Sequence, residues 1–220
     1  MSEKLQAIKT AVENGKVKVV AGLVEEALAA GEGAKEILNE AMIGAMSVVG
    51  EKFKNNEIFV PEMLIAARAM KKGVEVLAPA LKDAGSEPIG KLIIGTVAGD
   101  LHDIGKNLVA MMIEGAGFEV LDLGVDVPTE KFVDTLKEDP SIQIVALSAL
   151  LTTTMPAMKD ATDALNAYRK ETGRKLKILV GGAPITQAYA DEIGADGYSE
   201  DAASAAELAK KALADLKAGK

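Results

Sequence analysis

The stretch "KLIIGTVAGDLHDIGKNLVAMMIEGAGFEVLDLG", residues 91–124, contains two short apolar runs separated by a helical pattern. The runs at 91–97 and 118–124 are apolar at successive positions, which is typical of strands buried on both faces. Between them, residues 104–116 show the three- and four-residue apolar spacing of a helix. This order predicts parallel strands in a sheet that helices cover.

The same alternation continues toward the C-terminus. Further strands are predicted at 142–149, 176–182 and 195–200, and further helices at 129–138, 155–171, 186–193 and 201–216. Five strands separated by helices predict an α/β fold, a flavodoxin-like (Rossmann-like) doubly wound sheet of five parallel strands. We assign this domain to residues 91–220.

The N-terminal part has a different pattern. Apolar residues recur at helical spacing throughout residues 1–80, with glycines between the segments, which predicts a four-helix bundle. The segment "LKDAGSEPIG", residues 81–90, is polar and contains glycine and proline, so we expect a linker there.

Composition narrows the functions that remain. The net charge of −8 argues against binding to nucleic acid or to an anionic membrane. No apolar stretch reaches the ~20 residues of a membrane span, and the N-terminus lacks a signal-peptide pattern, so we expect a cytoplasmic protein. With no cysteine and one histidine, the chain cannot build a disulfide, an iron–sulfur cluster or a zinc site of the usual kind.

The only histidine, His102, directly follows the first predicted strand. In doubly wound sheets ligands bind at this edge, beyond the carboxyl ends of the strands. Asp100 and Asp103 lie close enough for either carboxylate to accept a ring N–H, which fixes the tautomer of a metal-ligating histidine. A single nitrogen ligand requires a metal already held in a macrocycle, a haem or a corrin. The alternative is a capping or surface histidine.

Asp100, His102 and Gly105 resemble the cobamide-binding Asp-x-His-x-x-Gly motif of corrinoid proteins. In that family the histidine replaces the cofactor's own lower base on cobalt, and the displaced nucleotide tail enters a channel between sheet and helix. The resemblance implies that His102 is the axial cobalt ligand of cobalamin or a related cobamide. It also implies cofactor contacts by the neighbouring residues Gly99, Leu101, Asp103 and Ile104.

Later positions resemble the same family in order. In "ALSALLTTT", Ser148 is implied to bond the displaced base, Thr152 to contact the tail, and Thr154 to bond the aspartate, where the family often has serine. Three small residues are implied to line the tail channel: Gly181, Gly182 and Ala202. Taken singly, each of these residues also fits an ordinary strand end, helix cap or turn.

The segment "VVGEKFKNNEIFVPEMLIAARAMKKG", residues 48–73, resembles the helical cap of methyl-transferring corrinoid proteins, including the cobalamin-binding module of methionine synthase. In that cap, apolar side chains shield the methyl group on the upper face of the cobalt. The matching positions are Phe53, Val60 and Met63. The alternative is that these residues are only part of the bundle core.

The resemblance implies a carrier without catalytic residues of its own. Its cobalt would alternate between methyl-Co(III) and Co(I), because a substrate-specific methyltransferase supplies the methyl group and a second methyltransferase removes it. Such systems serve methylamine, methanol, quaternary-amine and methoxy-aromatic metabolism in anaerobic bacteria and archaea, with tetrahydrofolate or coenzyme M as acceptor. A reductive activating protein is a further implied partner. The chain leaves no room for the (β/α)₈ barrel of about 250 residues that usually holds a methyl-donor site.

Three alternatives fit the sequence less well than a methyl carrier. A subunit of an adenosylcobamide-dependent mutase shares the motif but does not call for the bundle. A cobamide-binding sensor could share both domains, although no basic DNA-binding segment is present. A response-regulator-like domain would place an aspartate at the end of its third strand, where this chain has "IVALSAL".

Overall fold

The computed structural model describes residues 1–85 and 87–219, and it divides into two compact units. The first contains Met1–Ile89 and Glu114–Gly117. The second contains Gly90–Ile113 and the described residues from Phe118 onward. The division at Ile89 falls within the segment 81–90 that we expected as a linker. Ser86 of that segment and Lys220 at the chain end lie outside the described residues.

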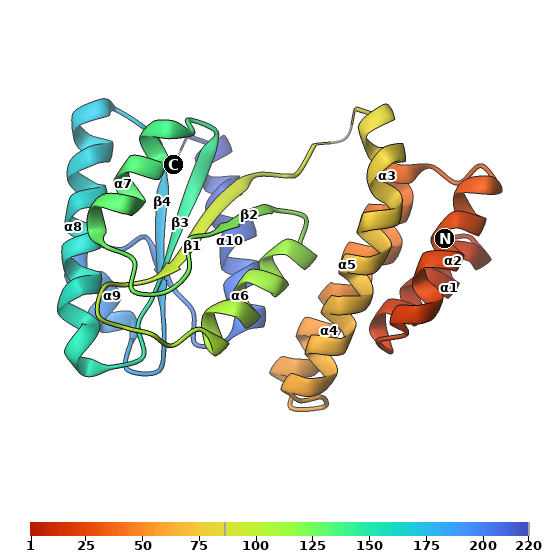
Figure 1. The fold of residues 1–220 in the computed structure, drawn as a ribbon, viewed down its shortest axis with the longest axis horizontal. Helices are drawn as coiled ribbons and strands as arrows, with labels where there is room; N and C mark the ends of the chain where they lie inside the picture. The colour runs from red at the N-terminus through yellow and green to blue at the C-terminus, as the bar shows by residue number, and fades with distance from the viewer. Residues whose placement is uncertain (86, 220) are drawn as a thin grey trace. The chain divides into compact units, whose positions relative to one another are not determined.

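The first unit is helical (Figure 1). Its elements are, in order, α1 (Glu3–Glu13), α2 (Val17–Ala29), α3 (Ala34–Glu36), the π-helical segment η1 (Ile37–Ile43), α4 (Gly44–Lys54) and α5 (Val60–Asp83). The segments α3, η1 and α4 follow one another without a break, so the unit has the four helical stretches that the apolar spacing predicts. The helix α5 extends three residues into the segment expected as a linker.

Helices α1, α2 and α5 pack against one another through apolar stripes. The largest fully buried side chains of this unit include Ile8, Ile37, Met42, Met63 and Leu77. The start of α5 follows from local chemistry, because Pro61 suits the first helical turn and the Glu62 carboxylate accepts the Phe59 backbone N–H at 3.1 Å.

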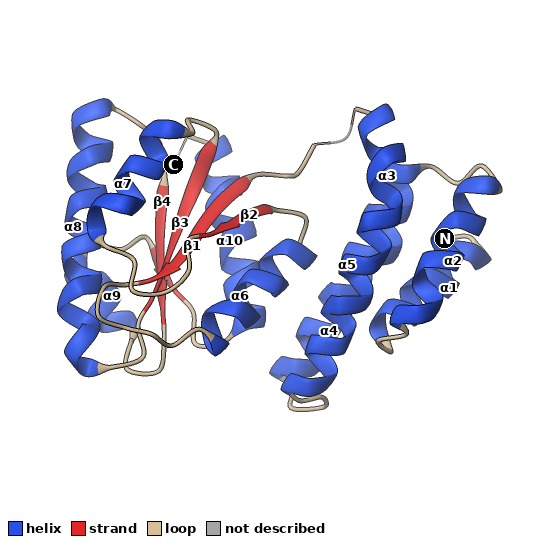
Figure 2. Cartoon of the chain, viewed as in Figure 1, coloured by secondary structure: helices blue, strands red, loops and turns tan. Residues whose placement is uncertain are grey.

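The second unit contains a five-stranded sheet (Figure 2). Its strands are β1 (Lys91–Thr96), β2 (Glu119–Asp122), β3 (Ile142–Ser148), β4 (Lys177–Gly181) and β5 (Gly197–Tyr198). All pairs are parallel, in the order β2-β1-β3-β4-β5. The chain runs outward from β1 to β2 and then returns to the other side of β1. The loops after β1 and β3 therefore lead to helices on opposite faces of the sheet (Figure 1), and in sheets of this kind ligands bind at the carboxyl edge between two such loops.

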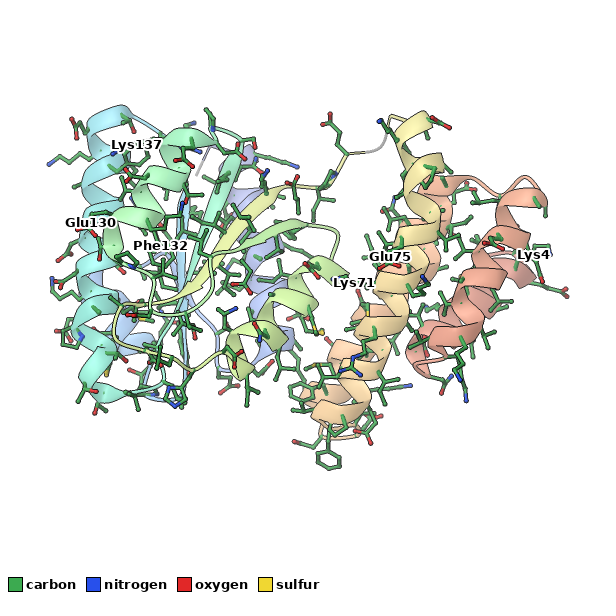
Figure 3. All side chains as sticks on the ribbon, in the orientation of Figure 1. Lys4, Lys71, Glu75, Glu130, Phe132 and Lys137 are labelled. Atoms are coloured by element: carbon green, nitrogen blue, oxygen red, sulfur yellow. The ribbon has the colours of Figure 1, made fainter. Side chains whose placement is uncertain are left out.

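Helices cover both faces of this sheet (Figure 1). They are α6 (Ile104–Gly115), α7 (Thr129–Glu138), α8 (Met155–Thr172), α9 (Gln187–Ile193) and α10 (Ala202–Lys217), with a short 3₁₀ turn η2 (Thr152–Thr154) before α8. One face packs against α7, α8 and α9, where Phe132 of α7 is fully buried against the sheet (Figure 3). The helices α6 and α10 lie on the other face.

The predicted fold class is confirmed, with each helix of the sheet domain within about a residue of its predicted bounds. The two outer strands are shorter than their apolar runs. The strand β2 has four residues, which pair with the first four of β1, and β5 has two, which pair with Leu179 and Val180 of β4. Among the described residues, no helix combines the length and apolarity needed to cross a membrane.

Candidate functional site

The loop between β1 and α6 places the histidine at the carboxyl edge of the sheet. The strand β1 ends at Thr96, and the fully buried Thr96 hydroxyl donates a hydrogen bond to the His102 carbonyl at 2.8 Å. Gly99 adopts a φ of +81°, which lets the chain turn sharply before Asp100. The loop is thus folded tightly and held at its end by the strand from which it leaves.

Asp100 joins this loop to the loop after β3. Its side chain is fully buried, and its two oxygens serve different partners. Oδ1 lies 2.7 Å from His102 Nδ1 and accepts the His102 backbone N–H at 3.1 Å. Oδ2 accepts the Leu150 N–H at 2.7 Å and the Thr154 hydroxyl at 2.8 Å. Of the two carboxylates that the sequence left open, Asp100 is the one on the imidazole.

The pKa of the Asp100 carboxyl lies well below its usual range. Burial is the largest single influence and raises this pKa. The hydrogen bonds from the Leu150 N–H, the His102 ring and the Thr154 hydroxyl together outweigh burial and lower it. An ionised carboxylate only accepts hydrogen bonds, so Nδ1 of His102 carries the proton. The other ring nitrogen, Nε2, is then the one suited to ligate a metal.

The His102 side chain is half-exposed and lies among exposed apolar side chains. Leu101 is 73% exposed and Ile104 is 75% exposed, and both flank the histidine in the loop. Leu150 and Leu151, whose backbone N–H groups face Asp100, are also exposed. A half-exposed imidazole with an apolar rim is the surface that a flat, largely apolar macrocycle needs.

Two glycines of the predicted site differ in what the chain requires of them. A Cβ on Gly182, whose φ is +129°, would lie 1.8 Å from the Ala149 carbonyl oxygen, so only glycine allows this approach of β4 to β3. A Cβ on Gly105 would meet no described atom within 4 Å, and its φ is not positive. Neither packing nor backbone conformation demands a glycine at 105, which fits a position where space is kept for a ligand.

The remaining predicted residues lie around the same edge. Ser148 ends β3, Thr152 begins η2, Gly181 ends β4 and Ala202 begins α10. The Asp103 carboxylate accepts from the Asn107 side chain at 3.2 Å, whereas the imidazole is held by Asp100. Contacts of all these residues with a cofactor stay predictions.

The three predicted cap residues belong to the helical unit. Phe53 near the end of α4 and Val60 at the start of α5 are half-buried, whereas Met63 is fully buried in that unit. Phe59, beside them in the sequence, is 64% exposed. Their shielding role also stays a prediction.

Sequence reasoning missed the residues that hold the histidine loop from the β2 side. Lys106 in the first turn of α6 is almost fully buried and pairs with Asp122 at the end of β2. Asp126, in the loop after β2, accepts the Gly99 N–H at 2.7 Å. The sequence did offer a signal for Lys106, since a lysine on an otherwise apolar helix face indicates a buried ion pair. No sequence signal singles out Asp126.

Replacing Thr154 with valine removes a hydroxyl that supports Asp100 while keeping the side-chain shape. We expect the unfolding free energy to fall by about 1–3 kcal/mol, since a hydrogen bond to a buried charged group is lost. Chemical denaturation measures this loss, and Thr154→Ser should restore most of it. Thr153→Val, at an exposed neighbour, is the matched control. Equal losses in the 153 and 154 variants would contradict the assignment.

The comparisons with known proteins agree with this geometry. Residues 90–207 and residues 4–78 each match a family model described as a B12 binding domain. The dimethylamine corrinoid protein 1 of Methanosarcina acetivorans is 42% identical over 216 residues, which are 96% of this chain and 98% of that protein. The chain belongs to the corrinoid proteins with B12-binding domains. The predicted family and the predicted cobamide cofactor are thereby confirmed.

Two solved structures resemble this corrinoid protein along most of its length. A cobalamin-binding protein from Desulfitobacterium hafniense is 33% identical, with a TM-score of 0.78 and coverage of 94% of this chain and 98% of that one. A chain of the methanol:cobalamin methyltransferase complex from Methanosarcina barkeri is 29% identical, with a TM-score of 0.81 and coverage of 97% and 80%. The domain pair of this chain therefore recurs in proteins that handle cobalamin.

Proposed function

We propose that this chain carries a methyl group on a bound cobamide, accepting it from one methyltransferase and delivering it to a second. The observation that carries the proposal is the half-exposed His102, whose Nδ1 is fixed by the buried Asp100 and whose surroundings are apolar. When bound, the cobamide supplies a cobalt centre that accepts and releases the methyl group.

Each part of the site has a role in this proposal. His102 ligates the cobalt through Nε2, and Asp100 and Thr154 keep the proton on Nδ1 and hold the ring in place. The exposed leucines at 101, 150 and 151 would exclude water from the cofactor when it is bound. Gly105 leaves room for the cofactor. The tail channel is lined by Ser148, Thr152, Gly181, Gly182 and Ala202.

The proposed partners are supported by the names of two similar proteins. The similar chain in a methanol methyltransferase complex supports a substrate-specific methyltransferase as one partner. The relative named for dimethylamine favours a methylated amine as the donor class. We also propose a second methyltransferase, with tetrahydrofolate or coenzyme M as acceptor, and a reductive activating protein. Phe53, Val60 and Met63 are proposed to shield the methyl group between these encounters.

The first test is reconstitution of the purified protein with hydroxocobalamin or methylcobalamin. We expect about one cobamide per chain and a visible spectrum of a histidine-ligated cobalt. In His102→Ala this spectrum should be lost. The affinity for the cobamide should fall more than about 100-fold, because loss of a residue that only supports a metal ligand already costs about 10- to 100-fold. Transfer of methyl groups from dimethylamine, with a dimethylamine methyltransferase added, then tests the carrier role.

Asp103→Asn is the matched control, because it changes a neighbouring carboxylate that bonds Asn107 and not the imidazole. Its spectrum should equal that of the wild type. A wild type that retains no cobamide would overturn the proposal. Identical spectra for the wild type and His102→Ala would remove His102 as the ligand.

A further inference from the structure

Asp126 occupies an unusual place in the loop between β2 and α7. It is exposed, and its backbone φ is +52°, in the left-handed region that residues other than glycine rarely adopt. Only one other non-glycine residue of the described chain, Asn56 in the helical unit, has a positive φ. A strained residue of this kind persists where its neighbours hold it in place.

The hydrogen bonds of Asp126 bracket two residues of the histidine loop. Its Oδ1 accepts the Gly99 N–H at 2.7 Å, and its own N–H donates to the Asp100 carbonyl at 2.9 Å. The left-handed turn is what allows one residue to reach both groups. The next residue, Val127, donates its N–H to the Thr96 carbonyl at 2.9 Å and forms a parallel bridge with Val97. The loop after β2 thus lies beside the chain from Thr96 to Asp100, the part that leads to His102.

Asp100 is therefore held from two opposite sides. The loop after β3 holds its side chain through the Leu150 N–H and the Thr154 hydroxyl. The loop after β2 holds its main chain through Asp126. Without the Asp126 carboxylate, Gly99 loses its partner on this side, and the main chain before His102 can rotate although the Asp100 side chain stays anchored.

We infer that Asp126 is a positioning residue for the metal ligand: it fixes the Gly99–Asp100 segment so that the His102 ring presents Nε2 at one angle. This inference rests on the proposed cobamide binding. In the described contacts Asp126 bonds neither the His102 ring nor Leu101, Leu150 or Leu151, so its effect passes through the main chain of Gly99 and Asp100.

The test uses two variants that both accept a positive φ. Asp126→Gly relieves the backbone strain but removes the acceptor for Gly99, whereas Asp126→Asn keeps a carbonyl oxygen at the same place. Asn56→Gly is the control for a change at a strained position elsewhere. The cobamide-free protein is examined by the ¹⁵N resonances of the imidazole, which belong to His102 because the chain has one histidine. The reconstituted protein is examined by its visible spectrum and its cobamide dissociation constant.

We expect Asp126→Gly to shift the His102 ring resonances, to lower the histidine-ligated fraction and to weaken cobamide binding about tenfold, the lower end of the effect of a ligand's supporting residue. Asp126→Asn and Asn56→Gly should behave like the wild type. Unchanged resonances and affinity in Asp126→Gly would overturn the inference, and so would equal losses in the Gly and Asn variants. If the wild type itself binds no cobamide, the proposed function fails, while the ring resonances still decide whether Asp126 positions His102.

Discussion

Gly182→Ala is expected to lower the unfolding free energy of the sheet domain by about 3 kcal/mol or more. The new Cβ would lie 1.8 Å from the Ala149 carbonyl oxygen and 2.8 Å from the carbonyl carbon. Both are backbone atoms at the end of β3, so they cannot move aside as the tip of a flexible side chain can. The backbone at 182 also has a φ of +129°, which alanine adopts only with strain.

Tyrosine fluorescence during urea unfolding measures this loss of stability in the domain that contains Gly182. The chain has three tyrosines and no tryptophan, and Tyr168, Tyr189 and Tyr198 all belong to the sheet domain. The signal therefore reports on that domain without a contribution from the helical unit. A midpoint equal to that of the wild type would show that β3 and β4 can separate at little cost.

Gly105→Ala is the matched control for this experiment. Its Cβ enters open space in the first turn of α6, so the cobamide-free protein should be as stable as the wild type or gain up to about 1 kcal/mol. Its cobamide affinity should nevertheless fall, because the added methyl group occupies space proposed for the cofactor. The pair thus separates a glycine that the fold requires from a glycine that we propose leaves room for the ligand.

Asp100→Asn is the second change with a large expected effect. The amide matches the carboxylate in shape, but its NH₂ group is a donor. It would face another donor, either the His102 ring or the Leu150 N–H and the Thr154 hydroxyl, so hydrogen bonds on that side are lost. With the carboxylate fully buried, we expect a loss of about 3 kcal/mol of unfolding free energy at pH 7.

The pH dependence of this loss has a definite sign. The folded-state pKa of Asp100 is lowered below its value in the unfolded chain, so its ionised form stabilises the fold. That contribution is fully present above about pH 5, and it is lost as the pH falls through the unfolded value of about 3.9 toward the folded value. The stability difference between wild type and Asp100→Asn should therefore be constant from pH 8 to about 5 and narrow below about pH 4.

Urea unfolding of both proteins between pH 8 and pH 3.5 measures the difference. Asp160→Asn, which removes an exposed carboxylate of α8, is the control and should follow the wild type at every pH. A difference between wild type and Asp100→Asn that stays the same at pH 3.5 would mean that the charge of Asp100 contributes nothing, and that only its shape matters.

The sheet could be predicted from the sequence because its strands are apolar on both faces and its helices have a different period. The fully buried Ile93, Ile144 and Ile178 belong to runs of this kind. The π-helical segment Ile37–Ile43 could not be predicted, since its apolar spacing is compatible with an ordinary helix. The expected linker began at residue 81 because "LKDAGSEPIG" is mostly polar and contains glycine and proline, yet α5 runs on to Asp83, since the last turn of a helix needs no continuous apolar stripe.

The side-chain hydrogen bonds of the site could be predicted from the sequence, whereas its main-chain hydrogen bonds could not. His102, Asp100 and Thr154 are reactive or polar residues in a motif, and the expected bond between Thr154 and Asp100 is present. The Leu150 N–H and the Asp100 carbonyl belong to every residue type, so no sequence pattern marks them as partners. Asp126 depends on a backbone angle that only the folded loop defines.

Because main-chain groups of Leu150 and Leu151 anchor Asp100, the anchoring of the site does not depend on which side chains surround it. The N–H groups that anchor Asp100 remain whatever side chain stands at 150 or 151, with proline as the exception. In a library randomised at these two positions, the side chains around His102 could therefore change to suit a bulkier or more polar corrinoid, while the hydrogen bonds that hold Asp100 against His102 stay in place. The loop after β3 can therefore vary in its side chains while its main chain continues to anchor Asp100.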